Sequence, residues 1–305
     1  MSTLASAAPR ALACEVAGPA DAPMLVALGG ISATRHVTAH AGDRRPGWWE
    51  GIVGDGCAID TRSRAVLGVD FLDGGRAPDG RPADIVTTHD QAAALVQQLD
   101  RFGVERVDIV GASYGGMVAL ALAERWPERV RRMVVISAAH RSDPMATALR
   151  AVQRRIIELG LGTERELEAM AVARALAMTT YRTRAEFDGR FSLATTGNGA
   201  HVEFDVEQYL MRAGARFAER TPPERQLALS LSADLHVVDP RRIRVPATLV
   251  AAQGDVLVPG AQMRALASAF GAPATLVQLR SRRGHDAFLT EPVRMTRILR
   301  AALAA

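Results

Sequence analysis

The sequence predicts an α/β fold with a mostly parallel central sheet, helices on both faces and a helical insertion. Three observations predict it. Short, continuously apolar segments alternate with helical segments before residue 137 and again after residue 240, as is typical of a parallel sheet buried on both faces. Between these regions helical patterns dominate, and one strand–turn–helix unit carries a serine between glycines. We therefore expect a core of residues 1–137 and 240–305 and a helical lid of residues 138–239.

Composition excludes several kinds of chemistry. Hydrophobic residues make up 48% of the 305 residues, enough for a sizeable core, and all 37 basic residues are arginine. Without lysine, the chain can contain neither a Schiff-base lysine nor a P-loop lysine. The net charge is only +4, and 33 acidic residues are dispersed among the arginines, so we expect no nucleic-acid partner.

Cysteine content and hydropathy indicate the compartment. Cys14 and Cys57 lie far apart without a C-x-x-C pattern, which favours reduced thiols and no metal site. The segment Met1 to Leu12 lacks a charged start followed by a long apolar region, and no window approaches 18 uninterrupted apolar residues. We expect a cytoplasmic protein that does not bind membranes.

The first half of the chain reads as strands separated by helices. Its strands are short apolar runs bounded by glycine, proline or charged residues, and its first helix has a buried stripe at Ala93, Leu95, Val96 and Leu99, with Thr88 as the expected N-cap. The expected elements are strands Met24–Leu28, Ala65–Asp70, Val107–Val110 and Arg129–Ser137, helix His89–Phe102, and a second helix that begins after the serine.

The second half begins with helices and returns to strands. Apolar residues at helical spacing predict four lid helices, and β-branched runs predict two further strands before a closing helix. The expected elements are helices Met145–Leu159, Glu164–Thr180, Val206–Glu219 and Glu224–Asp234, strand Ala247–Ala252, helix Gly260–Phe270, strand Ala274–Leu279, and a last helix after Leu289.

The serine unit is the chief functional signal. Gly111-Ala112-Ser113-Tyr114-Gly115 matches G-x-S-x-G, the strained strand-to-helix turn that exposes the nucleophile of α/β-hydrolases. The turn places Ser113 at a helix N-terminus, where free N–H groups favour developing negative charge. The motif alone is common, and a glycine-rich turn with an incidental serine is the alternative.

Two further residues match the partners that a nucleophilic serine requires. In this fold an acid and then a histidine follow the serine along the chain, each after a strand. Asp255 follows strand Ala247–Ala252, and His285 follows strand Ala274–Leu279 in a loop introduced by Gly284. The order predicts a catalytic triad of Ser113, Asp255 and His285.

The oxyanion hole is expected at the first strand. Its donors in this fold are the N–H of the residue after the nucleophile, here Tyr114, and an N–H from the early strand-to-loop junction, where Leu28 and Gly29 are the candidates. A glycine turn after an edge strand would explain the Leu28–Gly29 junction equally well.

Wider segments resemble one family. The tryptophan-pair loop Gly47–Thr61, the elbow ending in Gly115-Gly116-Met117, the segment Phe204–Leu210 with Phe217, and Gly284-His285-Asp286-Ala287-Phe288-Leu289 are similar to the homoserine O-acyltransferases of the MetX type. The similarity runs from about Leu25 to Leu299. Its tryptophan-pair and Gly-His-Asp segments are far more specific than G-x-S-x-G.

The resemblance implies an α/β-hydrolase with a helical lid, usually a homodimer through lid helices. Such enzymes move an acyl group from acyl-CoA to the serine and then to the hydroxyl of L-homoserine, by a ping-pong route and without a permanently bound cofactor. The resemblance also implies that Arg174 and Tyr181 hold the amino acid and that Asp286 takes its ammonium. Arg174 and Tyr181 are seven residues apart, so they share one helix face.

Structural roles remain possible for each of these three residues. Arg174 could form a surface ion pair, Tyr181 could pack in the lid core, and Asp286 could cap the last helix. The sequence departs from the family pattern at Ala112, Tyr114, Val26–Gly30 and the short Asp70–Asp84 loop. These departures leave the choice of acyl donor open. Acetyl-CoA is the favoured donor and succinyl-CoA is possible. The alternatives are a serine O-acyltransferase, an ester or thioester hydrolase, and a ligand-binding protein without activity.

Overall fold

The central element is a seven-stranded sheet whose order matches the predicted fold class. The computed structural model describes residues 11–198 and 201–304, so most of the Met1–Leu12 segment lies outside the described residues. In that part of the chain the sheet order is β1-β5-β2-β6-β7-β10-β11. Only β1 runs antiparallel to its neighbour. The strands are β1 (Ala13–Ala17), β2 (Met24–Leu28), β5 (Ala65–Asp70), β6 (Val107–Ala112), β7 (Val130–Ile136), β10 (Ala247–Ala252) and β11 (Ala274–Leu279).

Alternate side chains of these strands enter two separate cores, one on each face. Ile109 and Leu28 belong to the core that is covered by α1 (Thr88–Arg101), α2 (Tyr114–Arg125) and α8 (Gly260–Ala269). Val110 and Leu25 belong to the core that is covered by the tryptophan-pair loop, α9 (Ala287–Thr290) and α10 (Pro292–Ala304). The α/β prediction is confirmed, because strands covered on both faces read as continuous apolar runs.

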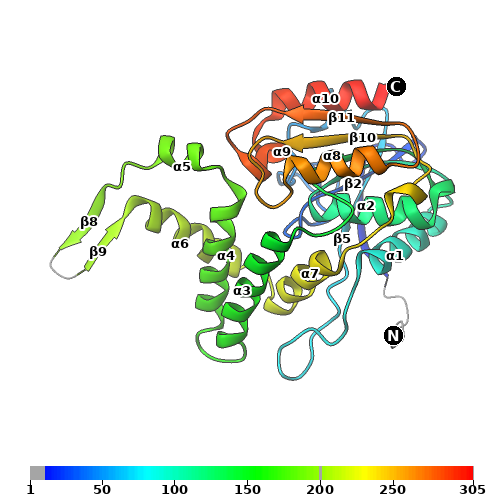
Figure 1. Cartoon of the computed structure of the whole chain (residues 1–305). Coiled ribbons are helices and arrows are strands. Elements are labelled where there is room, and N and C mark those ends of the chain that lie inside the picture. Colours follow the sequence, from blue (N-terminus) through cyan, green and yellow to red (C-terminus); the bar gives the residue numbers. More distant parts are fainter. Residues whose placement is uncertain (1–10, 199–200, 305) are drawn as a thin grey trace.

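The chain between β7 and β10 is mainly helical and extends to one side of the sheet (Figure 1). The four predicted helices are present, each with ends within two residues of the prediction. A fifth helix and a small hairpin were not predicted. The elements are α3 (Pro144–Gly160), α4 (Glu166–Tyr181), α5 (Arg184–Arg190), β8 (Thr195–Asn198), β9 (His201–Phe204), α6 (Asp205–Ala218) and α7 (Pro223–Leu235).

One predicted helix start is wrong by one residue. Thr87, and not Thr88, is the N-cap of α1, since its side chain accepts from the backbone N–H of Asp90 while the Asp90 carboxylate accepts from the N–H of Thr87. This reciprocal pair is a capping box, which requires the acid three residues after the cap. Thr88 is instead buried, and its hydroxyl is 2.8 Å from Nδ1 of the buried His236.

The remaining short elements are single turns or two-residue pairs. These elements are β3 (Val53–Gly54), β4 (Ile59–Asp60), η1 (Pro127–Arg129), η2 (Pro240–Arg242) and η3 (Gly284–Asp286).

No helix in the described part of the chain has the length and apolar character needed to cross a bilayer.

Candidate active site

Ser113 occupies the turn between β6 and α2 in a strained conformation. Its φ of 54° and ψ of −122° lie in a region that residues other than glycine rarely adopt. The flanking glycines are required by close approach, since a Cβ on Gly115 would lie 2.5 Å from backbone atoms of Leu28, and one on Gly111 would lie 2.4 Å from the Gly115 carbonyl oxygen. The turn therefore raises the Ser113 hydroxyl above the carboxyl end of the sheet.

The three residues of the predicted triad come together in one hydrogen-bonded chain. His285 Nε2 lies 2.8 Å from Ser113 Oγ, and His285 Nδ1 lies 2.8 Å from Asp255 Oδ2. The other oxygen of Asp255 accepts from the backbone N–H groups of Leu257 and Val258, at 2.9 and 3.0 Å. The Asp255 side chain is fully buried, so the carboxylate is fixed in direction and cannot turn away from the imidazole.

The electrostatics of His285 suit a general base that becomes a cation during the reaction. Burial alone would lower the pKa of the His285 imidazole, but the charge and hydrogen bond of Asp255 raise it, and Asp286 adds to this effect. The net pKa lies above the ordinary histidine value. A carboxylate behind the ring would stabilise the imidazolium if the ring took a proton from the serine.

The residues predicted to form the oxyanion hole lie at the start of α2 and at the end of β2, next to Ser113. Tyr114 is the first residue of α2, so its N–H has no acceptor within the helix. The Gly29 carbonyl accepts from the Gly115 N–H at 2.8 Å, which ties the β2 junction to the elbow. Gly30, one residue further on, lines the pocket, and a Cβ there would lie 3.9 Å from Ser113 Oγ. The oxyanion roles of Leu28 and Gly29 stay predictions.

A pocket of about 330 Å³ opens at Ser113 and receives side chains from both regions of the chain. Ser113 and His285 line it, together with Arg174 and Tyr181 of α4. The Tyr181 ring stacks at 6.0 Å on the His285 ring, and its hydroxyl accepts from Arg174 at 3.3 Å. The guanidinium of Arg174 also lies 4.5 Å from the centre of the Phe217 ring.

Asp286 lines the same pocket with a neighbour that was not predicted for it. Arg182 Nη2 lies 3.1 Å from Asp286 Oδ2, and both side chains are largely buried. Burial raises the pKa of the Asp286 carboxyl above its ordinary value, although Arg182, His285 and Arg174 act to lower it. The carboxylate thus already has one cationic partner, which leaves its second oxygen for a ligand.

Two further pocket residues were not predicted from the sequence. Ser137, at the end of β7, has a φ of 48° and a buried hydroxyl without a hydrogen-bond partner among the described residues. Arg141 lines the pocket, and its guanidinium makes no hydrogen bond or ion pair with any residue that the structure describes. The only sequence signal was their position after a central strand, at the sheet edge where ligands of α/β folds bind.

Comparisons with known proteins identify relatives of this chain. A family model described as alpha/beta hydrolase fold matches residues 23–292. The homoserine O-succinyltransferase of Xanthomonas campestris pv. campestris is 43% identical over 290 residues, which are 95% of this chain and 78% of that protein. The homoserine O-acetyltransferase of Thermus thermophilus is 34% identical over 287 residues, covering 85% of this chain and 72% of the relative.

A solved structure shows the same fold. The crystal structure of homoserine O-acetyltransferase from Bacillus anthracis superposes with a TM-score of 0.86, covering 96% of this chain and 92% of that one. Its sequence is 17% identical, so this likeness bears on the fold alone.

Proposed function

The chain belongs to the homoserine O-acyltransferase family of the α/β-hydrolase superfamily, and we propose that it moves an acyl group from acyl-CoA to the side-chain hydroxyl of L-homoserine. The observation that carries the proposal is the Ser113–His285–Asp255 chain at the base of a pocket whose wall presents Arg174 and Asp286. A cation and an anion beside a nucleophile match the carboxylate and ammonium of an amino acid.

The reaction proceeds in two halves. In the first, His285 Nε2 takes the proton of Ser113 as Oγ attacks the thioester carbonyl, and the thiol of coenzyme A leaves with that proton. In the second, the same nitrogen takes the proton of the homoserine hydroxyl as its oxygen attacks the acyl-serine. Ser113 is released and recovers the proton. Asp255 holds the imidazole in place throughout.

The acceptor lies between α4 and the His285 loop in this proposal. Arg174 is placed to pair with the carboxylate, since only one of its five guanidinium N–H donors bonds to a described residue, Tyr181. Asp286 supplies a carboxylate oxygen for the ammonium. L-Serine carries the same two charges with a side chain that is one methylene shorter, so it is the alternative acceptor.

One observation favours a succinyl donor over the acetyl donor expected from the sequence. Arg141 is a cation at the pocket wall without an anionic partner among the described residues, whereas Arg150 in the same wall is held by Asp234 at 2.6 Å. A free guanidinium suits the terminal carboxylate of a succinyl group. One relative, which is 43% identical over 290 aligned residues, is a homoserine O-succinyltransferase.

Residues 138–239 act as a lid in this proposal. α3, α4 and α7 contribute Arg150, Arg174 and Ala233 to the pocket, so these helices cover the nucleophile and limit the access of water. Exclusion of water would favour transfer to the bound alcohol over hydrolysis of the acyl-serine. Association into a homodimer through these helices stays a prediction.

Release of coenzyme A tests the proposal directly. Thiol release is measured with acetyl-CoA or succinyl-CoA, each without acceptor, with L-homoserine and with L-serine. A transferase gives a single burst of thiol without acceptor and steady turnover with it, and we expect the highest rate for succinyl-CoA with L-homoserine. Equal steady release in all three acceptor conditions would identify a thioesterase. No release with either donor would leave a binding protein.

A further inference from the structure

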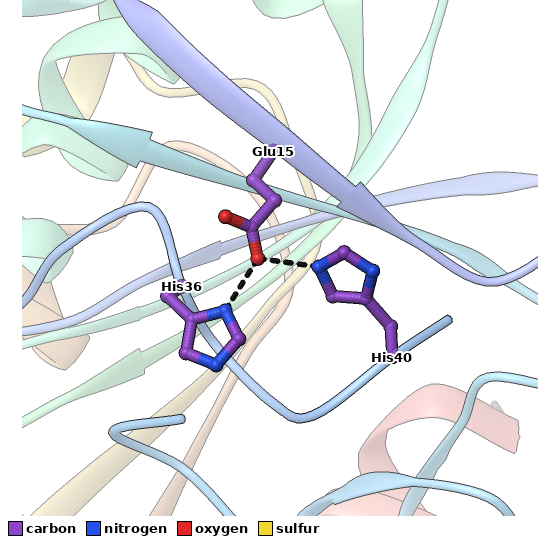
Figure 2. Close-up of side chains that lie close together, drawn as sticks. All are labelled: Glu15, His36 and His40. Atoms are coloured by element: carbon purple, nitrogen blue, oxygen red, sulfur yellow. Dashed lines mark hydrogen bonds and ion pairs between the residues drawn. The ribbon is translucent and has the colours of Figure 1, made fainter. Parts of the chain in front are cut away.

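A second group of titratable side chains lies outside the pocket, beside the edge strand β1. Glu15 Oε1 lies 2.5 Å from His36 Nδ1 and 2.6 Å from His40 Nε2, so both rings point at one carboxylate oxygen (Figure 2). The exposed fraction of the side chain is 21% for Glu15, 15% for His36 and 18% for His40. Glu15 belongs to β1, and both histidines belong to the loop that follows β2.

The hydrogen bonds around the rings determine where the protons are. His40 Nδ1 accepts from the Gly42 N–H at 3.1 Å, so the proton of a neutral His40 ring is on Nε2 and is donated to Glu15. His36 Nε2 lies 2.7 Å from the carbonyl oxygen of Arg45, which can only accept. His36 Nδ1 faces the Glu15 carboxylate, so both ring nitrogens donate and His36 is an imidazolium.

This proton pattern argues against a metal ion at the cluster. The three ligand atoms lie within 4.8 Å of one another, as in a His-His-Glu zinc site. A metal at His40 Nε2 would need the ring proton on Nδ1, where the Gly42 N–H already points. His36 would fit a metal, because its other nitrogen donates to a carbonyl, but one suitable histidine and one carboxylate do not complete the site.

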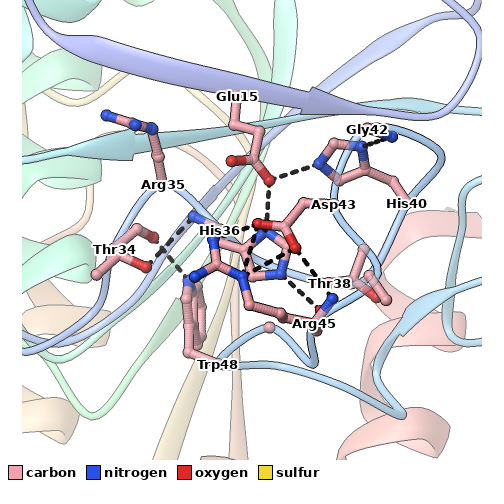
Figure 3. Close-up of polar contacts among 12 residues, drawn as sticks. Glu15, Thr34, Arg35, His36, Thr38, His40, Gly42, Asp43, Arg45 and Trp48 are labelled. Atoms are coloured by element: carbon pink, nitrogen blue, oxygen red, sulfur yellow. Dashed lines mark hydrogen bonds and ion pairs between the residues drawn. The ribbon is translucent and has the colours of Figure 1, made fainter.

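The cluster is bonded directly to the part of the loop that lines the active-site pocket. The Trp48 N–H donates to the His36 carbonyl at 3.2 Å, and the Trp48 ring N–H donates to the Thr34 carbonyl at 3.0 Å (Figure 3). Trp48 lines the pocket together with Ile31, and a Cβ on Gly29 would lie 3.1 Å from the Trp48 ring. The position of His36 therefore fixes one wall of the pocket and the junction beside Ser113.

We propose that Glu15, His36 and His40 are positioning residues that hold the loop of residues 31–50 in its substrate-accepting shape only while His36 carries both ring protons. This inference rests on the proposed acyltransferase function. When His36 loses a proton, its ring can donate to Glu15 or to the Arg45 carbonyl, but not to both. Two acceptors then face each other, and the loop that carries Trp48 loosens.

The sign of the pH dependence follows from the surroundings of His36. Burial alone would lower the pKa of His36, but its hydrogen bonds to Arg45 and Glu15 and the charges of Glu15 and Asp43 raise it. Both hydrogen bonds of the His36 ring are therefore present below this raised pKa, and one of them is lost as the pH rises through it. The other charged groups that face the ring or share its groove are His40, Arg45, Glu50, Arg35, Asp70 and Arg220.

Activity profiles of paired variants test the inference. In the parent, kcat/KM for L-homoserine falls on the alkaline side of the pH profile as His36 deprotonates. Glu15→Gln removes the neighbouring charge and moves the midpoint of that fall down by about one pH unit or more. His36→Gln cannot titrate, so the loop contribution to the fall disappears. His89→Gln is the matched control, because His89 contacts Glu124 at 2.9 Å and neither residue lines the pocket.

Two readouts do not depend on catalysis. They therefore distinguish failure of the proposed positioning role of His36 from failure of the proposed acyltransferase function. Tryptophan emission in a Trp126→Phe background reports on Trp48 and Trp49, and we expect it to titrate with the same midpoint as the alkaline fall. Long-range ¹H–¹⁵N spectra of the parent should show His36 protonated on both nitrogens at pH 6.

Three results would overturn the inference. One is a neutral His36 ring at pH 6, which contradicts the proton assignment without any variant. Another is an emission midpoint that Glu15→Gln leaves unchanged. The third is stoichiometric binding of Zn²⁺ in calorimetry that His36→Gln abolishes, since the cluster would then be a metal site.

Discussion

Replacing Arg174 by methionine is expected to separate the two half-reactions. Met retains an unbranched apolar stem that can stay between the Tyr181 and Phe217 rings, whose centres lie 5.0 and 4.5 Å from the guanidinium. The stacked position of Tyr181 on His285 is therefore preserved, while the positive charge and the donors are lost. We expect weaker binding of the acceptor and an almost unchanged rate of acylation by the donor.

The size of the effect follows from the bonds that are removed. A hydrogen bond to a charged group contributes about 1.5–3 kcal/mol. A tenfold change in affinity corresponds to about 1.4 kcal/mol. Loss of the guanidinium should thus raise the KM for L-homoserine by roughly 10- to 150-fold, provided that no other group takes the carboxylate.

Rapid mixing with acyl-CoA in the absence of acceptor measures the acylation rate from the burst of thiol, and steady-state turnover gives the KM for homoserine. Arg165→Met is the matched control, because Arg165 is the N-cap residue of α4, does not line the pocket, and pairs on the surface with Glu168 at 2.8 Å. A slower burst in Arg174→Met, or an unchanged acceptor KM, would show that Arg174 does not hold the acceptor.

Four other predictions follow. Ser113→Ala should lower kcat by about 10⁴- to 10⁶-fold, and full turnover in this variant would end the acyl-serine mechanism. Because His285 must be neutral to accept a proton and its pKa is raised, the burst rate should increase with pH through a midpoint above ~6.5; a midpoint well below that value would contradict the role of its carboxylate partner. Gly115→Ala should lower the free energy of unfolding in urea by about 1–3 kcal/mol, because the new Cβ would lie 2.5 Å from the backbone of the adjacent strand. Gly189→Ala is the control and should not destabilise the protein, because its Cβ would meet nothing within 4 Å. Equal effects of the two substitutions would refute the packing argument. Arg141→Met should lower turnover with succinyl-CoA about tenfold and leave turnover with acetyl-CoA unchanged, and a parallel loss with both donors would remove Arg141 from donor selection.

The sheet was predictable because its strands are buried on both faces. Such strands are continuous apolar runs, and each predicted strand agrees with the structure to within two residues. The hairpin β8–β9 gave no such signal, since residues Thr195, Thr196 and Gly197 are all exposed and no apolar face is required. The N-cap error at Thr88 arose between two adjacent threonines, which only the spacing to Asp90 distinguishes.

The site was predictable where chain order constrains it and not where it depends on tertiary contacts. Ser113, Asp255 and His285 each follow a strand of the parallel sheet, so their positions along the chain imply one common edge. The contact between Arg182 and Asp286 joins residues that are far apart in the chain, and nothing local to either one signals it. That Arg141 has no anionic partner among the described residues is likewise visible only once its neighbours are placed.

The end of α4 links the acceptor wall to the catalytic base. The Thr183 hydroxyl donates to the Arg282 carbonyl, and a Cβ on Gly284 would lie 3.2 Å from the Tyr181 carbonyl oxygen. The segment that carries Arg174 and Tyr181 is thereby fixed to the loop that carries His285. In the proposed reaction, a bound hydroxyl and the nitrogen that deprotonates it are positioned by the same set of contacts. Such fixed proximity raises the effective concentration of the bound alcohol far above that of a freely diffusing acceptor, which is the condition for acyl transfer to exceed hydrolysis.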